Sequence, residues 1–126
     1  MTHSALILFA HGARDPEWAA PIRRVRDVLL AANPDARVEL AFLEFMSPTL
    51  TEAAARLYAE GFRQLIVVPM FIAQGGHLKR DVPQMLETLR QEYPGLTLRQ
   101  TAAIGEVAEV ISAMAAYAAA QLQPTR

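Results

Sequence analysis

Short apolar runs alternate with helix-like stretches along this chain, and that alternation constrains the fold more than any other feature. The runs at 5–9 and 65–71 are apolar without interruption, which is typical of strands buried on both faces of a parallel sheet. Runs at 38–43 and 96–98 complete a set of four. Strands that alternate with helices indicate right-handed crossovers. We therefore predict an α/β fold with a small four-stranded parallel sheet, a βα unit repeated four times, and helices on both faces.

Capping residues and prolines mark the expected helices. Asp15-Pro16 supplies an N-cap and a first-turn proline for a helix that ends before Asn33-Pro34. Ser47-Pro48 opens a second helix, which stops at Gly61, and the third is expected to begin around 81–83. Residues at helical spacing form one apolar face in each helix: Trp18, Ile22, Val25 and Leu29; Leu50, Ala54, Leu57 and Tyr58; Val82, Met85, Leu86 and Leu89; and Val107, Val110, Ile111, Met114 and Ala118 in the alanine-rich last helix.

Length and composition indicate a single domain, 1–126. A chain of 126 residues that is 52% hydrophobic can bury a substantial core. The formal net charge of −1 provides no overall field for nucleic acid or an anionic membrane. The sequence has no cysteine, which excludes disulfides and thiolate metal sites. Neither a signal-peptide pattern nor an apolar run of about 18 residues is present, so we expect a cytoplasmic protein.

Two histidines follow strand-like runs at matching places. His11 follows the first run and precedes Gly12, while His77 follows Gly75-Gly76 after the third run. Both imidazoles should lie at the carboxyl edge of the sheet, where open α/β folds bind their ligands. The two glycines would let the backbone near His77 approach a ligand or move. His3, near the amino terminus, is expected to be an ordinary surface residue.

Glu44 ends the second apolar run, and its spacing links it to both histidines. Thirty-three residues separate His11 from Glu44, and the same number separates Glu44 from His77. Because equivalent points of adjacent βα units are neighbours, we expect the three groups to converge on one cavity. Two imidazoles and a carboxylate suit Fe²⁺, Co²⁺, Ni²⁺ or Zn²⁺ and leave coordination positions open. The same groups can accept protons near neutral pH, so each one's role stays open.

Basic residues accompany the histidines. Arg14 follows the first, and Lys79 and Arg80 follow the second, where they could hold an anionic ligand. Each candidate taken singly also has an ordinary interpretation. The basic residues would form a solvated rim, His11 would be satisfied by a backbone carbonyl, and His77 and Glu44 would be solvated. The matched spacing is what favours a site.

Together these motifs resemble those of the small CbiX-type sirohydrochlorin cobaltochelatases, of the class II chelatase group that includes the sirohydrochlorin ferrochelatases. The matching stretches lie at 6–16, at 41–44 with 47–50, and at 68–71 running through 75–83. They span most of residues 5 to 83. Ala13 stands where the family more usually has serine, which removes a hydroxyl near the site but no ligand.

The resemblance implies a lyase that inserts a divalent metal into sirohydrochlorin during cobalamin or sirohaem synthesis. Co²⁺ is favoured over Fe²⁺ and Ni²⁺ as the metal substrate, and no organic cofactor is implied. His11 and His77 would be the metal-handling histidines, and Glu44 would occupy the acidic position. The resemblance also implies a flavodoxin-like half-chelatase that works as a homodimer. A four-stranded sheet offers only a shallow cleft, so we expect the two copies to share and deepen it, and the charge balance indicates neither nucleic acid nor a membrane as a partner. Candidates for contact with the tetrapyrrole are Arg14, Lys79, Arg80, Gly75 and Gly76.

Other function classes use parts of the same pattern. A non-catalytic metal or tetrapyrrole carrier could employ the same histidines, and a turnover assay would separate it from an enzyme. His11-Gly12 suggests a phosphoryl-transfer enzyme with a nucleophilic histidine, but Ala10 stands where arginine would be expected. Nucleotide binding of the Rossmann type is disfavoured, because no Gly-x-Gly-x-x-Gly follows the first strand.

Overall fold

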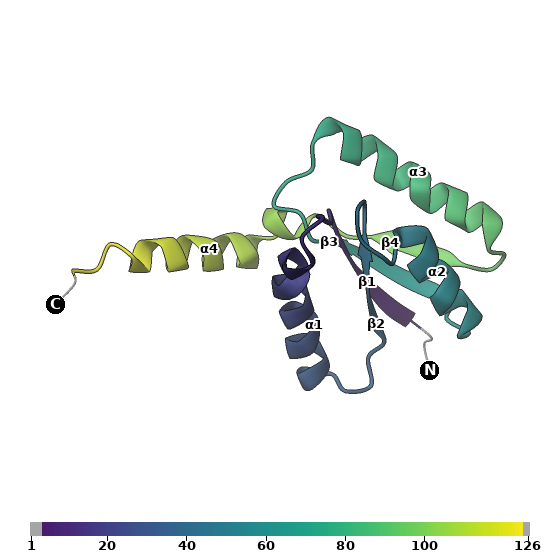
Figure 1. Ribbon diagram of the computed structural model, residues 1–126, viewed down its shortest axis with the longest axis horizontal. Helices are drawn as coiled ribbons and strands as arrows, with labels where there is room; N and C mark the ends of the chain where they lie inside the picture. Colours follow the sequence, from purple (N-terminus) through teal and green to yellow (C-terminus); the bar gives the residue numbers. More distant parts are fainter. Residues whose placement is uncertain (1–3, 125–126) are drawn as a thin grey trace.

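A four-stranded parallel sheet forms the centre of the molecule, in the order β2-β1-β3-β4 (Figure 1). The computed structural model describes residues 4–124, and its strands are β1 (Ser4–Ala10), β2 (Val38–Phe42), β3 (Gln64–Pro69) and β4 (Thr97–Gln100). Leu8 in β1 lies opposite both Leu40 and Val68. The predicted α/β class and parallel sheet are confirmed, with strand bounds that agree to within two residues.

The strand order places a switch point beside β1. The chain runs from β1 to β2 on one side and then crosses to β3 on the other. At such a point the loops after the strands diverge, and open α/β folds bind their ligands there. His11 directly follows β1, and the segment that leads to His77 follows β3. The fold therefore places both predicted histidines in the segments that flank the switch point.

Helices cover the two faces of the sheet unequally (Figure 1). α2 (Leu50–Ala59) and α3 (Gly76–Glu92) pack on one face, over the larger apolar cluster, where Phe9 and Phe71 meet edge to face with ring centroids 5.8 Å apart. α1 (Ala20–Ala32) lies on the other face, over a smaller cluster that includes Leu8 and Phe42. The more extensive packing on the α2–α3 face holds β1 and β3 in place.

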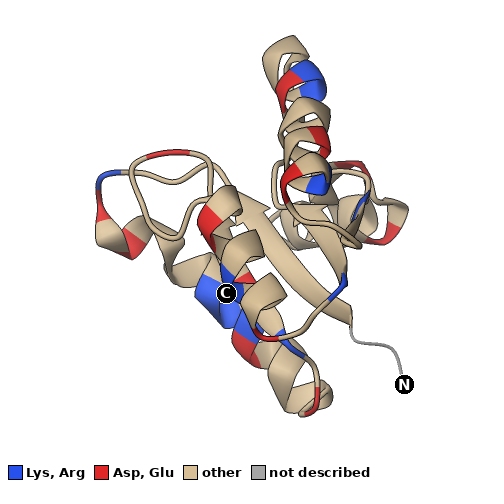
Figure 2. Cartoon of the chain, turned by 90° about the vertical axis from the view of Figure 1, so that its right-hand side faces the viewer, with Lys and Arg blue, Asp and Glu red and all other residues tan. Residues whose placement is uncertain are grey.

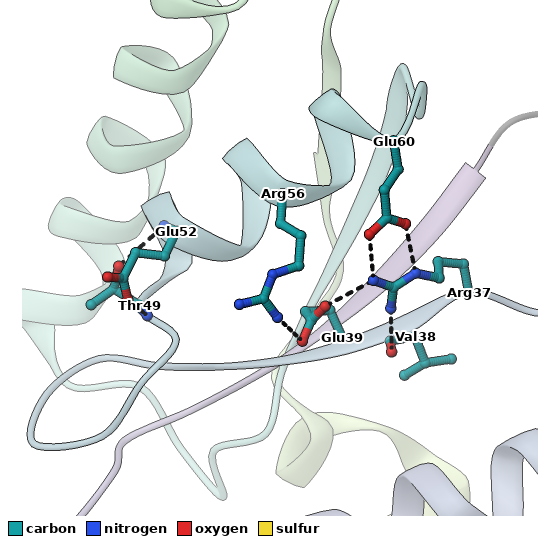
Figure 3. Close-up of polar contacts among 7 residues, drawn as sticks. All are labelled: Arg37, Val38, Glu39, Thr49, Glu52, Arg56 and Glu60. Atoms are coloured by element: carbon teal, nitrogen blue, oxygen red, sulfur yellow. Dashed lines mark hydrogen bonds and ion pairs between the residues drawn. The ribbon is translucent and has the colours of Figure 1, made fainter.

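Local capping explains where α1 and α2 begin. The Asp15 carboxylate accepts a hydrogen bond from the Glu17 N–H at 2.9 Å, which confirms the predicted cap, although the first turn is a 3-10 helix (Pro16–Ala19) that precedes α1. α2 begins at Leu50 rather than at Ser47-Pro48, because Thr49 and Glu52 form a capping box with bonds of 3.1 and 2.8 Å (Figure 3).

The predicted start of α3 at residues 81–83 is wrong, since the helix begins at Gly76 and contains Pro83. A proline inside a helix removes one backbone hydrogen bond and normally ends the helix. Here Val82, Leu86 and Leu89 are buried against the sheet, and that packing continues the helix past the proline. His77 consequently lies in the first turn of a helix and not in a loop.

α4 (Ala108–Ala120) points away from the sheet (Figure 1). None of its residues is buried by the rest of residues 4–124, so its predicted apolar face is not covered by the sheet. Two expected core residues are exposed, Trp18 to 39% and Val25 to 43%. Ile22 and Leu29 of the same expected set are partly buried on the sheet. The prediction that Trp18 and Val25 face the core is therefore wrong.

An ion-pair network joins the edge strand β2 to the end of α2 (Figure 3). The Arg37 guanidinium donates two hydrogen bonds of 2.9 Å to the Glu60 carboxylate and one of 3.1 Å to Glu39. Arg56 donates to the other Glu39 oxygen at 3.3 Å. The hydrogen bonds from Arg37 lower the pKa of Glu60, and those to Glu60 raise the pKa of Arg37.

Acidic and basic residues are otherwise interspersed over the surface, with no large field of one sign on the side shown in Figure 2. No helix in the described part of the chain has the length and apolar character that a membrane span requires.

We predict that Glu60→Gln destabilises the fold near pH 7 and that the difference from wild type disappears in acid. The pKa of Glu60 is lowered in the folded state, so its ion pair stabilises the fold above the ordinary carboxyl pKa of 4.5. That contribution is lost as the pH falls through the lower folded pKa. Urea midpoints at about pH 7 and about pH 3 measure the difference.

Glu92→Gln is the matched control, because Glu92 has no ion-pair partner among residues 4–124. A Glu60→Gln deficit of equal size at both pH values would contradict the assignment.

Candidate active site

His11 stands at the carboxyl end of β1 and is exposed. Its ring lies 4.3 Å from the ring of Phe71, centroid to centroid, at an interplanar angle of 45°. Phe71 is buried in the larger apolar cluster. The imidazole therefore rests on a rigid aromatic support while it stays accessible to a ligand.

Glu44 is a backbone neighbour of His11. Its N–H donates to the His11 carbonyl at 3.0 Å, and the Leu43 N–H donates to the Ala10 carbonyl at 2.9 Å. Gly12 has φ +91°, and a Cβ at this position would collide with the carbonyl oxygen of Glu44. Only glycine combines that backbone conformation with so close an approach. The turns after β1 and β2 are thus held together as one unit.

His77 is exposed in the first turn of α3. A guanidinium nitrogen of Arg80 lies 3.4 Å from its Nδ1, within reach of a hydrogen bond when Nδ1 is the acceptor. Lys79, also exposed, neighbours His77 in the chain. The predicted basic surroundings of this histidine are therefore present, and Arg80 contacts the ring itself.

The described residues do not bring the three groups together as a set of ligands for one ion. Among residues 4–124, no three histidine, aspartate or glutamate side chains lie close enough to hold a single ion. Glu44 lies two residues past the end of β2, whereas His77 lies eight residues past the end of β3, and β2 and β3 lie on opposite sides of β1. Two strand spacings separate these strands by about 10 Å. The individual roles of His11, Glu44 and His77 stay predictions, and His3 lies outside the described residues.

Phe45 is a prominent residue of this edge that the sequence did not single out. It has φ +68°, and its side chain is 57% exposed. The Arg14 guanidinium lies over the ring, 4.8 Å from its centroid. Phe45 and Met46 resume the apolar character of this segment after Glu44, whereas β2 ends at Phe42. An apolar stretch that outlasts its strand was the sign that could have revealed an aromatic side chain at the edge.

Known proteins provide a comparison for this fold and its candidate site. The CbiX family model matches residues 5–120. The chain belongs to the CbiX family. A sirohydrochlorin cobaltochelatase of Methanococcus aeolicus is 36% identical to this CbiX chain over 88 residues, which are 70% of this chain and 62% of that protein. One from Saccharolobus islandicus is 40% identical over 81 residues, 64% of this chain and 62% of the relative. The match thus spans less than two thirds of each relative's length.

Solved structures share the fold of this CbiX chain. A CbiX protein from Marinobacter aquaeolei superimposes with a TM-score of 0.84 at 30% identity, and the match covers 94% of this chain and 97% of that one. SirB from Bacillus subtilis with Fe³⁺ gives a TM-score of 0.80 at 22% identity, covering 98% of this chain but 49% of SirB. The fold of this chain therefore corresponds to about half of the SirB chain.

Gly12→Ala is expected to lower the free energy of unfolding by about 2 kcal/mol or more, because left-handed strain is joined by a collision with Glu44. The matched control is Gly95→Ala, since Gly95 has φ +81° and no atom lies within 4 Å of the place that an added methyl group would occupy. The Gly95→Ala variant would introduce the left-handed strain without a collision, so its free energy of unfolding should fall by about 1 kcal/mol. Urea unfolding measures both. Equal losses would mean that the two turns are not locked together.

Proposed function

We propose that this protein is a single-domain chelatase, a lyase, that inserts Co²⁺ into sirohydrochlorin, with Fe²⁺ and Ni²⁺ as alternative metals. The observation that carries the proposal is an accessible histidine at the switch point of a CbiX-family sheet. The names of the Methanococcus and Saccharolobus relatives support the choice of sirohydrochlorin and cobalt. A cytoplasmic location and the absence of an organic cofactor belong to the same proposal.

The exposed imidazoles suit the chemistry that metal insertion requires. The ion must lose bound water, reach the ring nitrogens from one face, and replace two pyrrole protons. A histidine that binds a divalent ion weakly can deliver it, and a second histidine with a carboxylate can accept the protons. We assign these tasks to His11 and His77, with Glu44 as the acidic group. Basic side chains and glycine backbone would contact the peripheral carboxylates of the substrate. These residues are Arg14, Lys79, Arg80, Gly75 and Gly76.

The incomplete ligand set of one chain supports a homodimer with a shared cleft. No group of three ligands forms within residues 4–124, and four strands offer loops on only one side of a broad, flat substrate. A second copy that faced the same edge would supply further histidines and enclose the ring. The SirB match, in which this fold covers 49% of the longer chain, is compatible with two units per complete site.

α4 supplies the contact by which two copies could associate. Its exposed apolar side chains include Ile111, Met114 and Tyr117, which are 47%, 39% and 74% exposed. The same chain has an apolar hollow on α1, lined by Pro21, Arg24, Val25, Val28 and Leu29. Because one chain carries both surfaces, a reciprocal exchange of α4 covers each surface on both copies and closes as a two-fold dimer.

The point at which α4 leaves the sheet favours the shared cleft. The 3-10 turn before the helix (Ile104–Glu106) is anchored where the Gly105 N–H donates to the Phe71 carbonyl at 3.0 Å. Phe71 also supports the His11 ring. A helix that crosses to a second copy from this point would draw the two histidine edges toward each other.

Replacement of His11 or His77 by alanine should slow metal insertion about 100-fold or more while the fold persists, because both side chains are exposed and outside the core. Anaerobic mixing with sirohydrochlorin and Co²⁺, Fe²⁺ or Ni²⁺, followed by absorbance, measures the rate. His3→Ala is the histidine control and should insert metal at the wild-type rate. Binding without turnover in the wild type would indicate the carrier function instead, and unchanged rates in both variants would refute the assigned roles.

The double variant Ile111→Glu/Met114→Glu should convert a dimer into a monomer and reduce metal insertion, because charge on this face opposes its burial. Sedimentation velocity at micromolar concentration measures the assembly. Ala116→Glu is the control, because residue 116 lies on the opposite side of the helix by its spacing. A wild-type monomer that turns over at full rate would refute the shared cleft.

A further inference from the structure

We propose that Phe45 and Arg14 form a stacking shelf that positions the flat face of the tetrapyrrole beside His11. This inference rests on the proposed function and adds to it a residue that fixes the orientation of the ring. The shelf is defined by the Phe45 ring with the Arg14 guanidinium 4.8 Å from its centroid.

The conformation of Phe45 has no explanation in the core of the fold. A phenylalanine at φ +68° occupies a region that bulky residues avoid, and such outliers concentrate where ligands bind. The side chain belongs to neither apolar cluster of the described residues and is 57% exposed. The positive φ therefore presents a largely exposed aromatic ring outside the core, in contact with the Arg14 guanidinium.

The position of Phe45 relative to His11 is fixed by the locked turns. Glu44, the preceding residue, is hydrogen-bonded to the His11 carbonyl at 3.0 Å. On the opposite flank, Ile72 follows Phe71, the support of the His11 ring, and is 69% exposed. Because β2 and β3 flank β1, an exposed apolar residue lies in the segment on each side of the one that carries His11. A planar conjugated ring that spanned these segments would lie close to His11.

Arg14 complements this surface in two ways. Its guanidinium over the ring restricts the aromatic side chain through a cation–π contact. It also places a positive charge at the margin of the shelf, where the carboxylates of a tetrapyrrole would project from the ring. A flat apolar ring with anionic substituents fits an aromatic face bordered by a guanidinium better than it fits either group alone.

The experiment compares Phe45→Gly, Phe45→Leu and Phe45→Trp. Sirohydrochlorin is titrated without metal to obtain its Kd, Co²⁺ insertion gives KM and kcat, and urea unfolding with sedimentation reports on the fold. Phe45→Gly should raise Kd and KM about tenfold with a smaller effect on kcat, since it removes a stacking contact. Its unfolding midpoint should equal or exceed that of wild type, because glycine relieves the positive φ. Phe45→Trp should restore binding, and Phe45→Leu should not.

Two outcomes would overturn the shelf. One is a wild-type Kd in Phe45→Gly, which would leave the chelatase proposal intact because wild type still binds and inserts metal. The other is loss of stability or of dimerisation in Phe45→Gly, which would make the ring part of the fold or of the contact between copies. Failure of wild type itself to bind sirohydrochlorin would instead refute the proposed function, and the shelf with it.

Discussion

The pairing of β1 on both of its sides is the constraint on which the rest of the structure depends. This strand is hydrogen-bonded to β2 and to β3, and its Ile7, Phe9 and Ala10 are fully buried. The bonds continue past the strand into the turn, where the residues after β1 hold those after β2. The position of His11 follows from this arrangement, since the end of the central strand can move only if both neighbours move.

Much of this organisation could be predicted from the sequence, because strands buried on both faces must be apolar throughout and helix starts must satisfy free N–H groups. The runs at 5–9 and 65–71 and the cap at Asp15 needed no tertiary information. The start of α3 did need it, because burial of Val82 and Leu86 outweighs the proline between them. The exposure of Trp18 and Val25 needed it too, since an apolar helical face does not reveal whether another element covers it.

The candidate site was also predictable from the sequence only in part. The equal spacing does not reflect the sheet register, in which Leu6 lies opposite both Val38 and Ile66. The sequence did place His11 and Glu44 just after their strands. It did not indicate lateral distance, which depends on strand order, and the crossover from β2 to β3 separates Glu44 from His77. The sequence did not identify Phe45 for another reason. Its importance lies in a backbone angle, and no periodicity of side chains records a positive φ.

Both outer strands of the sheet carry charge within their span. β2 includes Glu39, held between Arg37 and Arg56, and β4, only four residues long, includes Arg99. Charged and short edge strands oppose the addition of a further strand from another molecule. A continuous intermolecular sheet, the common route to aggregation, is therefore disfavoured at both margins. An exposed apolar helix is tolerable in this chain because neither edge of its sheet readily pairs with a strand of another molecule.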